Sequence, residues 1–355
     1  MITRLIAFFV LVAAGLVFGA TPAMAGVFTV PDDQATVQEA IDEAADGDEV
    51  VLKTGTYQEN IHLKGKNITL RSVDPEDPEI VKATVLDGGK QGSVITLAGS
   101  EGEHCVIAGI SVVHGATSGE EGRGGGIRGN DAMATIRYCA IPTNTAYSEG
   151  GGIVDLHGLI ERNILSGNTT GEGFKKGGAF ANCDGTISRN RVFNNHATGK
   201  GGAFFECHGV IKNNLIYDNT AGEDTGEGGG FHDCQADILN NVIFHNVAMD
   251  NGGGLSECTG TIANNILWGN SAWSEGPHFF KSAAPTHCCI EYWYGGGKGN
   301  MAEDPLFMDA EAGDFRLREG SPCLDVGLEL EEVSEAFDGV KRPQGGGFDI
   351  GAFER

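Results

Sequence analysis

Basic residues are scarce in this chain. Its 355 residues include 24 lysines and arginines against 49 aspartates and glutamates, and the formal net charge at pH 7 is −25. A surface of this sign repels phosphate groups, so nucleic acids and anionic membranes are disfavoured as partners. A polyuronate would also be repelled unless Ca²⁺ or a local basic cleft bridged it, whereas a neutral glycan meets no such barrier.

Long helical patterns are missing as well. From about Gly124 to Ala272 the chain has no apolar run of ten or more residues at helical spacing. Apolar residues come there in short bursts separated by glycine and asparagine. This pattern predicts two or three short strands in each stretch of about 25 residues.

The same region is a tandem repeat. A glycine run, a cysteine and spaced asparagines recur in fixed order, and the final asparagines lie alternately 24 and 27 residues apart. These final residues are Asn144, Asn168, Asn195, Asn219, Asn246 and Asn270. A unit of this length cannot bury a core alone, so the units must stack into a solenoid.

Aligning the units gives three apolar columns. We expect all three to point inward, where equivalent residues of successive coils lie about 4.8 Å apart. The columns are Ile153, Phe180, Phe204, Phe231 and Leu255; Ile160, Ile187, Ile211, Ile238 and Ile262; and Leu165, Val192, Ile216, Ile243 and Leu267. A fourth column is always asparagine: Asn163, Asn190, Asn214, Asn241 and Asn265. Asparagine suits the left-handed backbone of a tight bend, and its amide can bond to stacked neighbours, so we predict a structural role.

Both ends of the repeat region look like the caps that a solenoid needs over its first and last coils. Thr36 and Glu39 fit a capping box, which predicts a short amphipathic helix that starts at Val37 and stops at Gly47. Strands are expected next over 49–52, 55–57, 61–63 and 68–70. At the other end, a cap is expected from about Asp304.

The segment from Val37 to Tyr57, with Gly47-Asp48 and Gly55-Thr56-Tyr57, resembles the opening of right-handed parallel β-helix proteins of the pectin-lyase-like superfamily. The tail, with its Asp304-Pro305-Leu306-Phe307 and its final Asp349-Ile350-Gly351-Ala352-Phe353-Glu354, resembles the choice-of-anchor Q family of secreted bacterial β-helix proteins. The resemblance implies an all-β fold. We expect a right-handed parallel β-helix with a short N-terminal α-helical cap over residues 26–303, and a C-terminal capping region over 304–355.

That superfamily includes polysaccharide lyases, polygalacturonases, binding proteins and surface proteins, so the resemblance implies no single activity. This chain lacks the arginine-containing signature of pectate lyases. It also lacks the polygalacturonase combination of Asn-x-Asp, paired aspartates and Gly-His-Gly. Neither of those mechanisms transfers to it.

Residues 1–25 read as a secretory signal. Arg4 precedes an apolar stretch from Leu5 to Phe18, and the small-residue pattern Ala23-Met24-Ala25 precedes Gly26. We therefore expect a secreted protein, extracellular or periplasmic, with no membrane span after signal removal. An uncleaved membrane anchor is the alternative, although the apolar run is short for a span.

Four of the nine cysteines share one repeat column, and Leu156 takes their place in the preceding coil. These four are Cys183, Cys207, Cys234 and Cys258. A leucine in this register favours a buried ladder of thiols. Disulfides between successive coils are the alternative, because the coil spacing falls within the permitted Cα separation. No CxxC or HxxxH spacing supports a structural zinc site.

Ionisable residues gather beside the cysteine column, where we expect them to face outward. One column is Asp155, Asn182, Glu206, Asp233 and Glu257, and the column before it is Val154, Ala181, Phe205, His232 and Ser256. Stacked carboxylates repel, so a shared Ca²⁺ or a raised pKa is expected. Glu206, Asp233 and Glu257 are the candidate Ca²⁺ ligands. With His208 and His232 they are also the candidate catalytic residues for β-elimination or glycoside hydrolysis. A solvated acidic face is the alternative.

A second stripe is aromatic, and it consists of Phe193, Tyr217, Phe244 and Trp268. Each residue follows an inward aliphatic, so strict alternation places the stripe outside, where Tyr217 and Trp268 would bind sugar rings. A bend at this corner would instead turn the rings inward as core.

Two functions remain open from the sequence. The first is a secreted monomer that binds or processes a linear polysaccharide or cell-surface glycan, with Ca²⁺ as the candidate cofactor. The second is a non-catalytic structural or adhesion protein. Metal handling is a third, drawn from the ten histidines, the cysteines and a resemblance of the N-terminal coils to a copper-accessory β-helix family. An enzyme should have one irregular site with a few unique polar residues, whereas an adhesion repeat should have uniform ladders.

Overall fold

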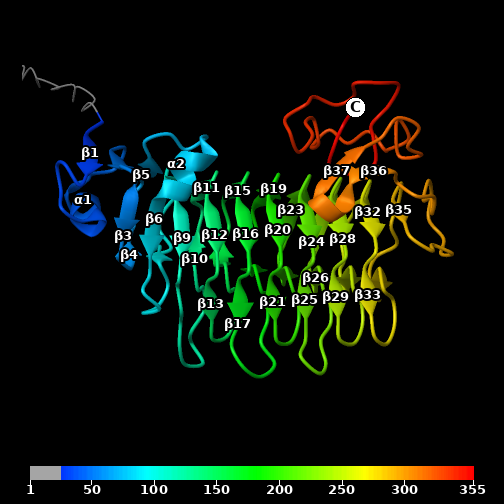
Figure 1. Cartoon of the computed structure of the whole chain (residues 1–355), viewed down its shortest axis with the longest axis horizontal. Coiled ribbons are helices and arrows are strands. Elements are labelled where there is room, and N and C mark those ends of the chain that lie inside the picture. The colour runs from blue at the N-terminus through cyan, green and yellow to red at the C-terminus, as the bar shows by residue number, and fades with distance from the viewer. Residues whose placement is uncertain (1–24) are drawn as a thin grey trace, which may run out of the picture.

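The computed structural model describes residues 25–355, so all but the last residue of the predicted signal lies outside the described part. The chain winds into a right-handed parallel β-helix that is elongated along one axis (Figure 1). The predicted fold class is therefore confirmed. Within residues 25–355, no helix is long and apolar enough to cross a membrane.

Four parallel sheets run along the solenoid. Sheet A contains β1 (Val27–Val30), β2 (Glu49–Leu52), β5 (Thr69–Ser72), β8 (Val106–Ala108), β11 (Thr135–Arg137), β15 (Leu159–Glu161), β19 (Thr186–Ser188), β23 (Gly209–Lys212), β27 (Ala236–Leu239) and β31 (Ile262–Ala263). Sheet B contains β3 (Gly55–Tyr57), β6 (Thr84–Asp87), β9 (Ser111–Val113), β12 (Ala140–Pro142), β16 (Ile164–Ser166), β20 (Arg191–Phe193), β24 (Leu215–Tyr217), β28 (Val242–Phe244), β32 (Ile266–Trp268) and β35 (Cys289–Ile290). Sheet C contains β4 (Ile61–His62), β7 (Ile95–Thr96), β10 (Ile127–Ala132), β14 (Ile153–Leu156), β18 (Phe180–Ala181), β22 (Phe204–Phe205), β26 (Phe231–His232), β30 (Leu255–Ser256) and β34 (Phe279–Phe280). Sheet D contains β13 (Thr145–Ala146), β17 (Thr169–Thr170), β21 (His196–Ala197), β25 (Thr220–Ala221), β29 (Val247–Ala248) and β33 (Ser271–Ala272).

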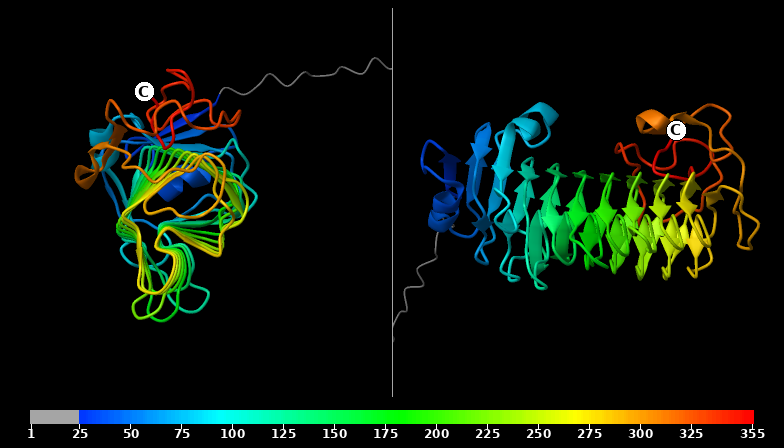
Figure 2. Two further views of the ribbon diagram at one scale, coloured as in Figure 1. Left: turned by 90° about the vertical axis from the view of Figure 1, so that its right-hand side faces the viewer. Right: turned by 60° about the horizontal axis from the view of Figure 1, so that its bottom comes forward.

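Each repeat coil runs through sheets C, A, B and D in that order. Seen along the axis in Figure 2, left, sheets A, B and C enclose the core, while sheet D and the loop that follows it project as a lobe at the bottom of the view. From β13 to β30 the loop from sheet D back to sheet C is alternately short and long, which explains the alternating repeat length.

The three predicted apolar columns are buried in the core, as expected. Their members pair in register from coil to coil, and the rings of Phe180 and Phe204 stack with centroids 4.8 Å apart. The cysteine column is buried too, and all nine cysteines are free. The thiol ladder is therefore confirmed, and disulfides between coils are absent from this structure.

Two asparagine columns form buried hydrogen-bonded ladders. The Oδ1 of Asn214 accepts from the backbone N–H of Asn190 at 2.9 Å and from its Nδ2 at 3.0 Å, while the Nδ2 of Asn214 donates to the carbonyl of Ile187 at 2.9 Å. The column from Asn144 to Asn270 is bonded in the same way at the next corner. The predicted structural role is confirmed.

The left-handed residue of the bend, however, is the one before each asparagine of the Asn163 column. These residues are Arg162, Arg189, Asn213, Asn240 and Asn264, with φ between 50° and 57°. The prediction that the ladder asparagines adopt this conformation is wrong, because their amides are turned into the core to reach the next coil.

The N-terminal cap is confirmed. Helix α1 (Val37–Glu43) begins at the N-cap Thr36, whose side chain accepts from the N–H of Glu39 while the Glu39 carboxylate accepts from the N–H of Thr36. Val37, Ala40 and Ile41 pack into the core of the first coils. A second short helix, α2 (Pro78–Ala83), was not expected; it lies outside sheet B near the N-terminal end (Figure 1).

The C-terminal segment, residues 304–355, lies beside the coils and not over the last one. It begins with β36 (Phe307–Asp309), η1 (Ala310–Ala312) and β37 (Asp314–Leu317). It packs on the outside of sheet B, at the upper right of Figure 1, through a second hydrophobic cluster. The core of the last coils is instead covered by Phe279, Ala283 and Trp293. The predicted position of the C-terminal cap is therefore wrong, because its apolar residues match the flank of the solenoid.

Candidate functional site

The predicted ionisable strip is built from three columns that run side by side along the coils. The corner column lies between sheets C and A and consists of Asp155, Asn182, Glu206, Asp233, Glu257 and Lys281, all with left-handed backbone, φ between 46° and 55°. The floor column, in sheet C, consists of Val154, Ala181, Phe205, His232, Ser256 and Phe280. The lobe column precedes each glycine run and consists of Glu149, Lys176, Lys200, Glu227, Asn251 and Glu275. We call the three together the strip.

The floor column corrects one prediction. From Val154 to Ser256 it is buried, although sequence alternation placed it outside. The lobe covers it, because the left-handed glycine that follows each lobe-column residue lies directly on a floor side chain. A Cβ added at Gly228 would stand 2.7 Å from the Cβ of His232. The glycine runs are thus required by this close packing.

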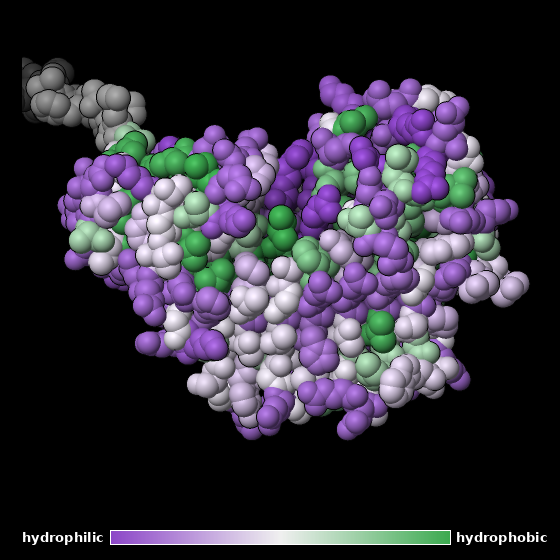
Figure 3. Space-filling model, viewed as in Figure 1, coloured by the Kyte–Doolittle hydropathy of each residue, from purple (hydrophilic) through white to green (hydrophobic). Residues whose placement is uncertain are grey.

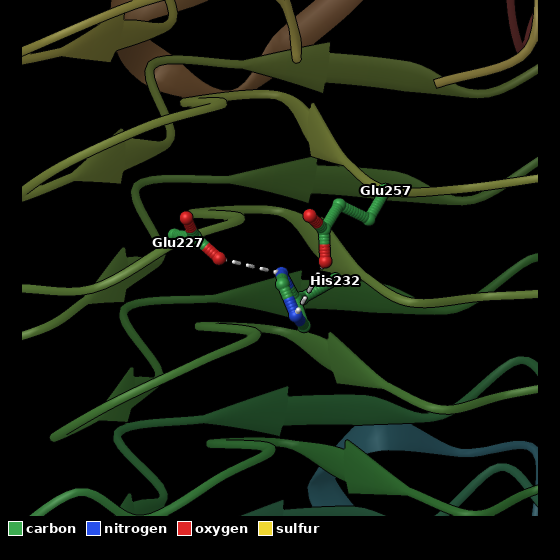
Figure 4. Close-up of side chains that lie close together, drawn as sticks. All are labelled: Glu227, His232 and Glu257. Carbon is green, nitrogen blue, oxygen red and sulfur yellow. Dashed lines mark ion pairs between the residues drawn. The ribbon is translucent and has the colours of Figure 1, made fainter. Parts of the chain in front are cut away.

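His232 lies between two carboxylates (Figure 4). Its Nδ1 is 3.8 Å from Oε2 of Glu227 in the lobe, and its Nε2 is 3.8 Å from Oε2 of Glu257 at the corner of the next coil. His232 is only 2% exposed, and its Nδ1 has no hydrogen-bond partner. The hydroxyl of Ser256, the next residue of the floor column, is also buried without a partner.

Burial and nearby lysines set the charge states here. Desolvation, reinforced by the charges of Lys200 and Lys176 and opposed by Glu227, lowers the pKa of His232 to about 4. The imidazole is therefore neutral at pH 7. Burial acts to raise the pKa of Glu227, but hydrogen bonds from Lys200 at 2.9 Å and from Asn251 at 3.2 Å lower it overall, so this carboxyl group is ionised.

Other charges along the strip are partly paired. Arg123 bridges Glu149 and Asp155, each at 2.8 Å, which explains why Asp155 is more buried than predicted. The ammonium of Lys176 lies 4.5 Å from the ring centre of Phe205, in a cation–π contact.

The predicted site residues fall in two places. His232 and Glu257 share the cluster just described, and Glu206 and Asp233 lie in the same corner column on the preceding coils. His208 lies past the corner, where its Nδ1 is 2.7 Å from Oδ1 of Asp184. Asp184 also lines a separate shallow depression of about 760 Å³ on sheet A. Catalytic roles for these residues stay predictions.

Within residues 25–355, one group of three acidic or imidazole side chains is close enough to share an ion, with ligand atoms within 4.8 Å of one another. It consists of Glu227, His232 and Glu257, so Glu206 and Asp233 are not brought together with Glu257. In the sequence Glu227 belongs to an acidic loop, residues 223–227, that could be assigned to Ca²⁺ or to solvent but not to the strip, because the lobe column does not repeat one residue type. Its position directly before a glycine run was the available signal.

The aromatic stripe lies outside, as alternation predicts, but it is not an open surface. The C-terminal segment packs on it: the ring of Tyr217 meets Phe315 edge-on, with centroids 5.3 Å apart, and Trp268 packs against the same cluster. The expectation of open ring faces at Tyr217 and Trp268 is therefore not met. Sugar binding by them stays a prediction, and packing already gives both a structural role.

Beside the C-terminal segment the surface is hollowed, as Figure 3 shows. A depression of about 430 Å³ lies between α2 and sheet B, and its lining includes Tyr138 and Ile164. It holds no cluster of titratable groups comparable with that around His232, and the strip remains the best candidate site within residues 25–355.

Comparisons with known proteins agree with the fold. No protein-family model and no curated protein sequence matches this chain. Among solved structures, the pectate lyase Pel9A is similar with 15% identity and a TM-score of 0.55, covering 93% of this chain and 96% of its own. A pectin methylesterase from Aspergillus niger is similar with 13% identity over 91% of this chain and 98% of its own, but its TM-score is only 0.31. The pectate lyase shows that the chain shares the parallel β-helix architecture.

Proposed function

We propose that the protein binds a linear polysaccharide along the strip, with the ligand centred on Glu257, the most exposed member of the Glu227, His232 and Glu257 cluster. The observation that carries this proposal is the irregularity of the floor column. The structural ladders repeat one residue type from coil to coil, whereas this column has one buried histidine between carboxylates. A unique polar site on a repetitive scaffold favours ligand chemistry over a uniform adhesion face.

The proposed ligand is a neutral glycan. The corner column presents carboxylates at Glu206, Asp233 and Glu257 on successive coils, and such groups accept hydrogen bonds from sugar hydroxyls but repel uronates. Because equivalent residues repeat about every 4.8 Å, an extended chain can contact several coils at once.

Affinity electrophoresis with a panel of neutral and uronic polysaccharides tests this proposal. We expect retention by a neutral glycan, and we expect Asp233→Ala to weaken it about tenfold, as one lost charged hydrogen bond would. The matched control is Asp184→Ala, which removes the same side chain from the sheet A depression and should leave retention unchanged. Retention that depends on Asp184 and not on Asp233, or retention by no glycan, contradicts the proposal. Reducing-end and ultraviolet assays of the same mixtures report any cleavage.

A further inference from the structure

We propose that Glu227, His232 and Glu257 form a binding site for one divalent transition-metal ion of the zinc class. Nδ1 of His232 and one oxygen of each carboxylate would be the protein ligands. This inference concerns the centre of the strip, but it does not depend on glycan binding, because the metal alone is the ligand.

The spacing of the three side chains fits ligands better than hydrogen-bond partners. Nδ1 of His232 lies 3.8 Å from Glu227 and Nε2 lies 3.8 Å from Glu257, and both distances are too long for hydrogen bonds. The ligand atoms lie within 4.8 Å of one another. Ligands at about 2.0–2.2 Å from one tetrahedral zinc ion are roughly 3.3–3.5 Å apart. The Glu257 carboxylate, which now faces Nε2, would therefore have to turn toward Nδ1 to close the site.

The orphaned imidazole nitrogen is an independent indication. A buried polar atom without a partner is costly, and native structures keep few of them. Nδ1 of His232 and Oγ of Ser256 are two such atoms on adjacent coils of one column. A bound ion would give Nδ1 the partner that it lacks.

The donor set selects the type of ion. One imidazole nitrogen and two carboxylate oxygens suit zinc and its neighbours in the first transition row, whereas Ca²⁺ and Mg²⁺ prefer ligand shells made of oxygen. The sequence-based prediction placed Ca²⁺ at Glu206, Asp233 and Glu257. The proposed site shares only Glu257 with that set.

Three lysines face the site and act as built-in competitors. Lys200 bonds to Oε2 of Glu227 at 2.9 Å, Lys281 lies 3.9 Å from Oε1 of Glu257, and Lys176 lies over the neighbouring Phe205 ring. An arriving cation must displace the Lys200 ammonium from Glu227. Removing that ammonium should therefore tighten metal binding.

The strip offers this donor set only once among residues 25–355. The equivalent positions on the neighbouring coils are Lys176, Ala181 and Glu206; Lys200, Phe205 and Asp233; and Asn251, Ser256 and Lys281. Each of these sets has at most one carboxylate and no imidazole. We therefore expect a stoichiometry of one ion per chain at the strip.

Calorimetric titration of chelator-treated protein with Zn²⁺ tests the site, and the visible absorption of bound Co²⁺ provides a second readout. We expect one ion per chain, at least tenfold weaker binding in Glu257→Gln, and loss of binding in His232→Phe. Phenylalanine already occupies this column one coil earlier, so the variant should fold, and circular dichroism checks that it does. Lys200→Met should bind Zn²⁺ several-fold more tightly.

The control is His208→Ala, which disrupts the pair of His208 with Asp184 outside the cluster and should leave the titration unchanged. Zinc binding that survives His232→Phe, or that is lost in His208→Ala alone, overturns the proposal. So does wild-type protein that binds no Zn²⁺ at millimolar concentration. Weaker Zn²⁺ binding in Lys200→Met contradicts the inference that the Lys200 ammonium competes with the ion for Glu227.

Discussion

Each repeat coil has a left-handed residue at the corner between sheets C and A and another at the corner between sheets A and B, and the two corners differ in what they contact. At the corner column the left-handed residues, such as Glu206 and Glu257, remain partly exposed. At the corner after sheet A, Asn213 and Asn264 donate from their side chains to backbone carbonyls of Glu335 and Leu328, each at 2.7 Å. The C-terminal segment is docked on this second corner.

The difference follows from the side chains that each corner presents. A carboxamide both donates and accepts, so it pairs with passing backbone: the N–H of Leu328 also donates to Oδ1 of Asn264 at 2.8 Å. Carboxylates only accept, and a column of them repels an acidic chain. One corner therefore binds the protein's own segment, and the other stays available to an external ligand.

The largest expected effect comes from releasing the docked segment. Arg342 and Glu354 form an ion pair at 2.7 Å with neither side chain exposed, and Arg342 also donates to the carbonyl of Gly351. Arg342→Ala leaves a buried carboxylate uncompensated, so we expect docking to weaken by about 3–5 kcal/mol. Hydrogen exchange across residues 304–355 measures this. The corner after sheet A, with Asn213 and Asn264, should then become as accessible to solvent as the corner column.

Arg316→Ala is the matched control, because Arg316 pairs with Asp314 at the surface with 62% of its side chain exposed. The Arg316→Ala variant should leave hydrogen exchange across residues 304–355 unchanged. A double variant, Arg342→Met with Glu354→Leu, should restore much of the protection, since a buried pair can be replaced by apolar residues of similar volume. Unchanged protection in Arg342→Ala would show that docking does not depend on this pair.

A smaller effect on the docking of the C-terminal segment is expected from pH. Burial raises the pKa of Asp349 to about 6, while hydrogen bonds from the N–H groups of Asp325 and Arg355 oppose the shift. The docked state thus binds this proton more tightly than the unfolded chain, whose pKa is near 3.8. Docking should weaken as pH rises from about 4 to 6, on the order of 1–2 kcal/mol, and stay weaker above it.

Exchange of residues 304–355 at pH 5 and pH 7.5, corrected for the intrinsic rate, tests the sign of this dependence. Asp349→Asn should abolish it. Stronger docking at pH 7.5 than at pH 5 in the unmodified protein would contradict the prediction.

The smallest expected effect concerns the backbone strain of the left-handed glutamates in the corner column. Glutamate is disfavoured in the left-handed region, whereas asparagine tolerates it. Glu206→Asn should therefore raise the free energy of unfolding by about 1 kcal/mol, while it removes one carboxylate from the strip. The urea midpoint of the β-sheet signal measures this change. The reverse swap one coil earlier, Asn182→Glu, should lower the midpoint, and a fall in both variants would reject the explanation.

The sequence predicted the parts of the molecule that repeat. The inward columns, the Asn163 ladder and the thiol ladder could be found because each coil meets the same environment and keeps a similar residue. The Thr36 capping box was readable because it is local. The same kind of signal was present for α2, where Asp77 caps a helix that starts at Pro78, but it was overlooked.

The parts that the sequence did not predict depend on contacts between coils and segments. Alternation placed His232 outside, and no strand pattern could reveal that the lobe folds over it. Tyr217 and Trp268 were correctly placed outside the coil, but only the tertiary structure shows the C-terminal segment on top of them. Glu227 joined the cluster from a loop whose length and sequence vary between coils.

The lobe loop that lengthens in every second coil gives the solenoid a modular unit of two coils, from Asn144 to Asn195 and from Asn195 to Asn246. Successive coils stack on their neighbours, so duplication of the first pair in the gene would extend the ladders and leave the second pair, with its cluster and docked segment, in place. The Glu227, His232 and Glu257 cluster occurs in one place along the strip. The length of the exposed surface and the chemistry at its centre can therefore evolve independently.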